Sequence, residues 1–290
     1  MSDRAVLCEI NRFPVKSMLG ETLSTAEVTT SGIVGDRGWA LVDVETGKVA
    51  SAKHPRLWDG LLNLRARYID ATGPGAAVRI DTADGTTATS TDPAVDTQLS
   101  AMIGRHVRLE AAPRSDASYD AVWPDIPGVA PEEFIAATRS GSTSGSEDIS
   151  SLPVGILAPG TFHDFAAITI MTTSSLRTAA RMHPAGDWDP RRFRSTLLVD
   201  IEEDGFAEQR WIGRRVHIGD VALDVAIPIP RCVMTTLAQQ ELSKDPKILH
   251  TLAKHNRLDV AGTGRFACLG VYATVAQPGR ITLDQTITLS

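Results

Sequence analysis

The sequence has few cysteines and few aromatic residues for its length. Its 290 residues include 3 cysteines, Cys8, Cys232 and Cys268, and aromatic side chains make up 5% of the chain. An odd number of widely spaced cysteines excludes a disulfide scaffold and a CxxC zinc site. It also favours a reducing compartment, so we expect a cytoplasmic protein.

Long apolar runs and an excess of positive charge are also missing. No stretch approaches the roughly 18 apolar residues that span a bilayer, and the start Met1-Ser2-Asp3-Arg4 lacks the features of a signal peptide. With 29 Lys+Arg against 35 Asp+Glu, the net charge is −6. This balance argues against a basic face over the whole domain. We therefore expect neither a membrane nor a nucleic acid as partner.

Several well-known catalytic and nucleotide-binding motifs are absent. The sequence contains no GxGxxG after a strand, no GxxxxGK[ST], no GxSxG and no HExxH. Nucleotide binding, serine hydrolysis and zinc proteolysis therefore lose support.

Short apolar stretches bounded by Gly, Pro or Asp recur along the chain and predict strands. The first alternates in period 2 from Val6, and Gly219-Asp220 predicts a hairpin between residues 215–218 and 221–227. Many short strands with few helices predict a mainly β fold of the α+β class. We expect two β-barrel-like lobes rather than a doubly wound α/β sheet.

Two helices carry clear boundary signals. Asp92 suits the cap and Pro93 the first position of one helix, which Gly104 ends. Asp245-Pro246 opens the second. A further short helix is expected at residues 131–138.

The composition divides the chain into three parts. Residues 1–112 and 165–290 are rich in predicted strands, whereas residues 113–164 form a connection rich in Pro, Gly and Ser. Its stretch Ser140-Gly141-Ser142-Thr143-Ser144-Gly145-Ser146 is low in complexity and favours a mobile, solvated linker.

Cys232 stands apart from the other two cysteines. Cys8 and Cys268 lie in strand-like stretches and are expected to be small buried hydrophobic residues. Cys232 follows two prolines and Arg231, just beyond a predicted strand. If Arg231 lies near the thiol in space, it lowers the pKa and favours the thiolate, which attacks electrophiles or binds soft metals. A purely structural role is an equally good interpretation.

Basic residues also occur in apolar or glycine-rich surroundings. Each alone is typical of a solvated charge, but together they would form an anion site, because guanidinium groups bind phosphate in a bidentate way. These residues are Lys16, Arg37, Lys53, Arg56, Arg191, Arg192, Arg194 and Arg231. Thr172, Thr173 and Ser174 precede a helical pattern, where their hydroxyls either cap the helix or contact an anion.

Several short motifs, in this order and spacing, resemble the MOSC family, named for the C-terminal domain of molybdenum cofactor sulfurase. The sequence looks closest to the two-part members that include the mitochondrial amidoxime-reducing component and its bacterial relatives. The motifs are Phe13-Pro14-Val15-Lys16-Ser17, Gly35-Asp36-Arg37-Gly38-Trp39, Ala52-Lys53-His54-Pro55-Arg56-Leu57, Thr172-Thr173-Ser174-Ser175-Leu176, Arg192-Phe193-Arg194, Pro230-Arg231-Cys232 and Leu269-Gly270-Val271-Tyr272. The resemblance implies an N-terminal β-barrel domain over 1–112 and the MOSC domain over 165–290, with a cofactor cleft between the lobes.

The resemblance also implies roles for particular residues in binding a molybdenum cofactor, or molybdopterin. Cys232 would be the thiolate ligand of the metal. Residues that would hold the pterin and its phosphate are Lys16, Ser17, Arg37, Arg194 and Arg231, with Thr173 and Ser174 as weaker candidates. The family often has Arg-Pro-Asn where this chain has Arg194-Ser195-Thr196, so Thr196 either replaces the asparagine contact or leaves it unmade.

By the same resemblance the protein is expected to be a molybdenum-dependent oxidoreductase that reduces N-hydroxylated substrates. It has no flavin, haem or iron–sulfur motif, so a separate electron-donor protein, of flavoprotein or ferredoxin/cytochrome type, is expected. The alternative is a sulfur carrier or cofactor-delivery protein that uses Cys232. A binding domain without turnover is a third interpretation. No acid–base residue is assigned, and Asp36 is expected to pair with Arg37 or another arginine.

Overall fold

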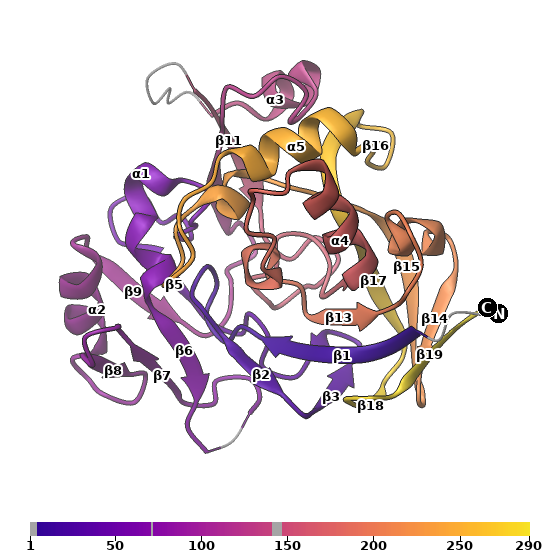
Figure 1. The fold of residues 1–290 in the computed structure, drawn as a ribbon. Helices are drawn as coiled ribbons and strands as arrows, with labels where there is room; N and C mark the ends of the chain where they lie inside the picture. Colours follow the sequence, from indigo (N-terminus) through magenta and orange to yellow (C-terminus); the bar gives the residue numbers. More distant parts are fainter. Residues whose placement is uncertain (1–4, 71, 141–146) are drawn as a thin grey trace.

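The computed structural model describes residues 5–70, 72–140 and 147–290, and the fold is mainly β, as the sequence predicts (Figure 1). Residues 1–4 and the stretch 141–146, which holds most of the predicted mobile linker, lie outside the described residues.

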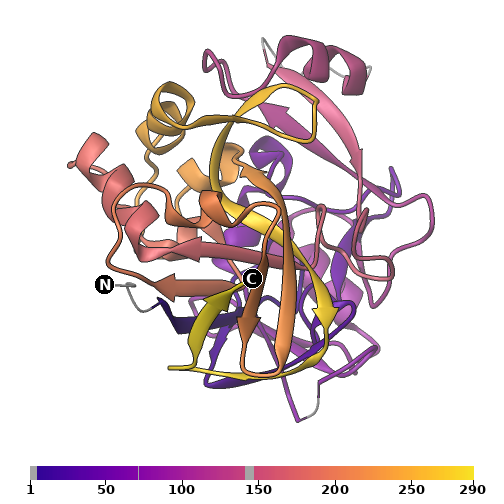
Figure 2. The same cartoon turned by 90° about the vertical axis from the view of Figure 1, so that its right-hand side faces the viewer.

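A closed barrel of seven strands forms the centre of the structure. In order around the barrel, its strands are β12 (Ile168–Thr172), β13 (Leu197–Asp200), β1 (Ala5–Arg12), β19 (Thr286–Leu289), β14 (Arg215–Ile218), β15 (Val221–Pro230) and β17 (Arg265–Gln277). The barrel closes because β12 pairs with both β13 and β17. Figure 2 faces the side formed by β14, β15 and β17. Alternate residues of these strands, such as Leu7, Ile170 and Val199, fill the interior.

The first strand of the chain belongs to this barrel. β1 lies between β13 and β19, both from the C-terminal part of the sequence. Its alternating pattern buries Leu7 and Ile10, and a register shift between Leu7 and Glu9 bends the strand along the barrel. The N-terminal residues therefore do not fold apart from the C-terminal ones.

Smaller sheets and helices surround the barrel. The remaining strands are β2 (Glu21–Leu23), β3 (Thr25–Thr29), β4 (Gly32–Ile33), β5 (Ala40–Asp43), β6 (Arg65–Tyr68), β7 (Val78–Asp81), β8 (Thr87–Thr89), β9 (Val107–Glu110), β10 (Ser118–Trp123), β11 (Asp148–Pro153), β16 (Arg257–Asp259) and β18 (Gly279–Thr282). The α-helices are α1 (Pro55–Trp58), α2 (Val95–Ile103), α3 (Glu132–Thr138), α4 (Thr173–Met182) and α5 (Lys247–His255). Apolar residues of α4 and α5, including Ala179, Leu249 and Leu252, pack on the outside of β12, β13 and β17.

Two predicted boundaries are wrong, for identifiable reasons. Helix α2 begins at Val95 rather than at Pro93, because the Asp92 carboxylate accepts the amide of Ala94 and holds a turn before the helix. Strand β15 continues through Pro228 to Pro230. Register shifts against β17 at these positions accommodate prolines, which have no amide to donate.

The expected connection over residues 113–164 is largely folded rather than a solvated linker. Its strands β10 and β11 pair along their whole length, and α3 follows Pro131 as predicted. Tyr119 and Phe162 are buried in an apolar cluster with Val42 of β5. In Figure 1, α3 and β11 lie at the same end of the molecule as α5.

Among the described residues, every helix is too short or too polar to span a bilayer.

Candidate functional site

One cavity gathers six of the predicted site residues from both parts of the sequence. These are Lys16, Ser17, Arg37, Arg194, Arg231 and Cys232. The first three follow β1 or precede β5, and the last three flank β13 and β15. The cavity lies where the chain leaves the barrel strands, so side chains far apart in sequence meet there.

Thr173, Ser174 and Thr196 do not line this cavity. Thr173 donates a hydrogen bond to Asp200, and Ser174 to the carbonyl of Gly205. Both belong to the first turn of α4, which Thr172 caps by accepting the amide of Ser175. The capping interpretation is therefore the one that the structure supports for this segment.

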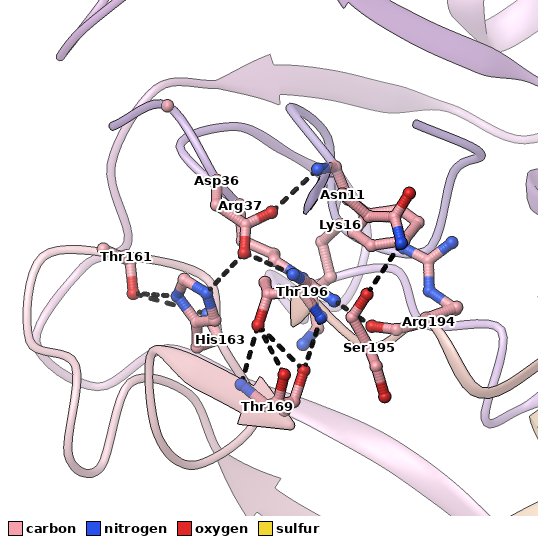
Figure 3. Close-up of polar contacts among 12 residues, drawn as sticks. Asn11, Lys16, Asp36, Arg37, Thr161, His163, Thr169, Arg194, Ser195 and Thr196 are labelled. Atoms are coloured by element: carbon pink, nitrogen blue, oxygen red, sulfur yellow. Dashed lines mark hydrogen bonds and ion pairs between the residues drawn. The ribbon is translucent and has the colours of Figure 1, made fainter. Parts of the chain in front are cut away.

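Thr196 lies behind the residues that line the cavity. It is fully buried, and its hydroxyl donates to the carbonyl of Thr169 at 2.9 Å. Thr169 itself lines the cavity, and Figure 3 shows the hydrogen bonds between the two threonines. Thr196 thus fixes the neighbouring threonine and does not face the cavity itself.

Three cavity residues have a left-handed backbone. The φ angle is 63° at Ser17, 49° at Arg37 and 53° at Arg194. This region costs non-glycine residues about 1–2 kcal/mol each and is found mostly where the surroundings impose it, often at functional sites. At Ser17 these surroundings include a hydrogen bond that the Ser17 hydroxyl accepts from the backbone amide of Ala52 at 3.1 Å.

Two guanidinium groups lie against the same aromatic ring. The Arg37 and Arg194 guanidinium carbons are 4.4 Å and 4.2 Å from the Phe13 ring centroid. Arg194 also donates to the carbonyl of Met18 at 2.6 Å. Burial and the nearby charge of Arg37 lower the pKa of Arg194 to about 9. The positive charge here exceeds what the surrounding groups neutralise, which favours an anionic ligand.

Lys16 and Lys53 share one carboxylate, that of Asp164. Lys16 forms an ion pair with Asp164 and donates to the carbonyl of Phe162 at 2.9 Å. Nζ of Lys53 lies 2.9 Å from Oδ2 of Asp164 and donates a hydrogen bond to the Tyr119 hydroxyl at 3.1 Å. Burial lowers the pKa of Lys16 to about 8. Burial alone would raise the pKa of Asp164, but the two lysines lower it far below its usual range.

A buried histidine and aspartate support Arg37. The Asp36 carboxylate accepts the Phe13 amide at 2.7 Å, pairs with Arg37, and lies 3.1 Å from Nε2 of His163 (Figure 3). Burial opposes ionisation of Asp36, but Arg37 and His163 lower its pKa. Burial lowers the pKa of His163, so the ring is neutral at physiological pH. The expectation that Asp36 pairs with Arg37 is confirmed.

Arg231 has one nitrogen without a partner. Its Nε donates to the carbonyl of Leu269 at 2.7 Å and its Nη1 to that of Phe193 at 2.9 Å. Its buried Nη2 has no hydrogen-bond partner among the residues that the structure describes, and burial lowers the pKa of the group. A buried donor left unpaired costs about 1–3 kcal/mol, so an acceptor bound in the cavity would be stabilised by it.

Cys232 follows Arg231 at the end of β15 and begins the short 3₁₀ turn Val233–Thr236. It is half-buried and free, and it lines the cavity. Cys268 is fully buried, as expected, and Cys8 is half-buried, with its Sγ 3.3 Å from the carbonyl oxygen of Leu198. Cys232 is therefore the cysteine placed to meet a ligand.

Sequence reasoning missed several cavity residues. They are Phe162, His163, Asp164, Thr169 and Tyr272. Lys53 and Arg192, which were expected among the basic residues of an anion site, do line the cavity. Tyr272 lies inside the motif Leu269-Gly270-Val271-Tyr272, which was the available signal for it. His163 and Asp164 lie in the segment interpreted as a linker, where nothing in the local pattern distinguishes a site residue.

The donor set fits an anionic, thiol-ligated group. Six cationic side chains line the cavity, Lys16, Arg37, Lys53, Arg192, Arg194 and Arg231, against the one carboxylate of Asp164. The unpaired Nη2 of Arg231 offers a hydrogen bond, and Cys232 offers a soft ligand. These are the groups that a phosphate-bearing pterin bound to a thiophilic metal requires.

The chain has distant likenesses to solved structures. The YuaD protein from Bacillus subtilis is similar with 13% identity and a TM-score of 0.35, over 52% of this chain and 73% of that chain. YiiM from Escherichia coli is similar with 17% identity and a TM-score of 0.30, over 43% of this chain and 54% of that chain. The chain thus spans about half the length of YiiM. No curated protein matches the sequence.

Two family models together match most of the chain. The MOSC N-terminal beta barrel domain matches residues 4–115, and the MOSC domain matches residues 159–288. The two matches follow each other in the order that the motifs predict. The MOSC domain is associated with proteins of the molybdenum cofactor. Together with the cavity that both regions build, the matches show that the chain belongs to the MOSC family.

Proposed function

We propose that the protein binds a pterin-based molybdenum cofactor and reduces N-hydroxylated substrates. The observation that carries the proposal is the position of Cys232, which lines the same cavity as six cationic side chains and the Asp164 carboxylate. No group of three or more His, Cys, Asp or Glu side chains forms a metal site within residues 5–70, 72–140 and 147–290. A metal at Cys232 would therefore take its other ligands from a cofactor.

Each part of the cavity has a role in this proposal. Arg37, Arg194 and Lys16 would hold the phosphate and pterin, and Arg231 would donate its free Nη2 hydrogen to the same ligand. Cys232 would bind the metal as a thiolate. When bound, the cofactor supplies two-electron redox chemistry that side chains alone do not provide.

Reduction of an N–OH group to N–H consumes two electrons and two protons and releases water. Burial raises the pKa of Tyr272 to about 12, so its hydroxyl keeps its proton at neutral pH. Burial alone would lower the pKa of Lys53, but Asp164 raises it. Both groups line the cavity beside Cys232, where they would donate hydrogen bonds to the departing oxygen. A separate donor protein would supply the electrons, because the sequence carries no flavin, haem or iron–sulfur motif.

Metal analysis of protein made in a host that synthesises the cofactor tests this proposal. We expect wild-type protein to carry molybdenum, and Cys232→Ser to lose most of it. Cys8→Ser is the matched control, since the Cys8 residue belongs to β1 and does not line the cavity. Absence of molybdenum from the wild type, or equal amounts in Cys232→Ser, would contradict the proposal.

An assay of benzamidoxime reduction with a chemical or flavoprotein donor separates the two uses of the thiol. A reductase converts the substrate, and Cys232→Ser does not. A sulfur carrier or delivery protein would instead hold cofactor or cyanide-labile sulfur on Cys232 without turnover.

A further inference from the structure

A second cavity, of about 260 Å³, adjoins the first at Cys232. The two cavities share one group of lining residues, Lys53, Asp164, Pro230, Arg231, Cys232 and Tyr272. All charged residues of the second cavity belong to this shared group. Its remaining described walls carry no charge, so charge is confined to the end at Cys232.

Aromatic rings form much of the uncharged wall. The chain has 7 Phe, 5 Trp and 3 Tyr, and six of these aromatic residues line this one cavity. Three of them pack edge to face or tilted against one another, Trp123, Phe134 and Phe266. Phe165 and Tyr272 form another pair, with ring centroids 5.3 Å apart. Such walls bind a flat apolar group and leave little for a small hydrophilic one.

Much of the wall comes from residues that neither family model matches. The models end at 115 and resume at 159, and strands β10 and β11, helix α3 and Ile156 fall between. This segment contributes Tyr119, Trp123, Phe134, Leu152 and Ile156 to the cavity. Family membership alone therefore does not account for this cavity.

Ile156 marks the mouth of the cavity. It lines the cavity and is 50% exposed, so it lies where the cavity meets solvent. Its neighbour Leu157 is 43% exposed but does not line the cavity. Comparing substitutions at these two residues therefore distinguishes an effect at the cavity mouth from an effect of surface exposure alone.

We propose that this second cavity binds the carbon skeleton of the substrate, an uncharged aromatic or bulky aliphatic group, with the polar head directed toward Cys232. The described residues of this segment, 116–140 and 147–158, would then determine which skeletons are accepted. The identity of the head group rests on the proposed function, whereas the preference for an apolar skeleton rests on the cavity alone.

Direct binding measurements on the full chain test this inference without turnover. Benzamidoxime and acetamidoxime share one neutral head group and differ in a phenyl or a methyl group. We expect calorimetry to show benzamidoxime binding at least tenfold more tightly, because the ring removes more apolar surface from water. Quenching of Trp123 fluorescence, compared with the variant Trp123→Phe, places the bound ring at this wall.

Variants at the mouth complete the test. Ile156→Asp is expected to weaken benzamidoxime binding at least fivefold, because a carboxylate at the mouth disfavours an apolar ligand. Leu157→Asp, the matched control, is expected to leave the affinity unchanged, and circular dichroism checks the fold of both variants. Equal affinities for the two probes, or equal effects of the two substitutions, would overturn the inference. Molybdenum content, measured separately, reports on the proposed function, so either idea can fail while the other stands.

Discussion

Arg37 donates a hydrogen bond from Nη2 to the backbone carbonyl of Arg194, at 3.0 Å, across 157 positions of the sequence. Both residues have a left-handed backbone, and both guanidinium groups lie against Phe13. The contact joins the region matched by the N-terminal barrel model to the region matched by the MOSC model. The cationic cavity therefore depends on both parts of the chain at once.

The Phe13 ring is predicted to stabilise this pair of arginines. Phe13→Leu keeps an apolar side chain but removes the π face, and each cation–π contact contributes about 0.5–2 kcal/mol. We expect the free energy of unfolding to fall by about 1–2 kcal/mol in urea denaturation. A double-mutant cycle with Arg194→Met should give a coupling energy of about 0.5–1 kcal/mol. Strictly additive effects would show that the ring acts only through its bulk.

Anion binding is predicted to weaken as the pH rises through about 8. Below this value Lys16, whose pKa burial lowers to about 8, carries its charge, and above it the charge is lost. Sulfate is the suitable probe, because its own charge is constant from pH 7 to 9. We expect its affinity, measured by calorimetry, to fall about fivefold to tenfold over this range.

Lys16→Arg is the control for that experiment, because it removes the amine that titrates near pH 8. The variant should show a smaller fall in sulfate affinity between pH 7 and 9 than the wild type, with Arg194, whose pKa is about 9, responsible for the fall that remains. A fall of equal size in both proteins would place the titrating group elsewhere.

Acid is predicted to destabilise the protein partly through His163. Burial lowers the pKa of His163 below the ordinary value of 6.5, so the folded state binds this proton less readily than the unfolded state. The stabilising contribution is present above pH 6.5 and is lost as the pH falls below it. In His163→Gln, the fall in unfolding free energy between pH 7.5 and 5.5 should be smaller by about 1 kcal/mol. Burial also lowers the pKa of His54, so both proteins should retain some acid sensitivity, and identical pH profiles would exclude a role for His163.

The fold class could be predicted from the sequence because the signals for strands and tight turns lie in neighbouring residues. Alternation around Val6 and the turn at Gly219-Asp220 depend on near neighbours, and the structure has β1 and the β14–β15 hairpin there. Closure of the barrel could not be predicted, because the pairing of β1 with β13 and β19 joins distant segments. Composition also gave a wrong expectation for residues 113–164, where β10 and β11 pair along their whole length.

The candidate site could be predicted only in part, for a similar reason. Lys16, Arg37, Arg194, Arg231 and Cys232 stand in recognisable motifs, and the structure brings them to one cavity. The hydroxyls of α4 follow a motif too, but the helix uses them for its own first turn. Asp164 belongs to the site because it forms an ion pair with Lys16, 148 positions away in the sequence. A contact between such distant residues cannot be predicted from local sequence patterns.

Gly270 is predicted to be irreplaceable because Ile170 and Arg231 leave no room for a Cβ. Its φ is +78°, and a Cβ there would lie 2.8 Å from the carbonyl oxygen of Ile170 and 3.1 Å from Nη2 of Arg231. Gly262 has nearly the same φ, +76°, with no atom within 4 Å of a Cβ, so Gly262→Ala measures the backbone cost alone. We expect that cost to be about 1–2 kcal/mol, and Gly270→Ala to lose about 1–3 kcal/mol more in urea denaturation.

The same substitution should also affect ligand binding, because the added methyl group displaces the one nitrogen of Arg231 that has no partner. Sulfate affinity should therefore fall severalfold in Gly270→Ala and stay unchanged in Gly262→Ala when both are measured by calorimetry at pH 7. If Gly270→Ala is destabilised but binds sulfate as the wild type does, Nη2 of Arg231 does not take part in anion binding. The role of Arg231 would then be confined to the carbonyl groups of Phe193 and Leu269, which it already contacts.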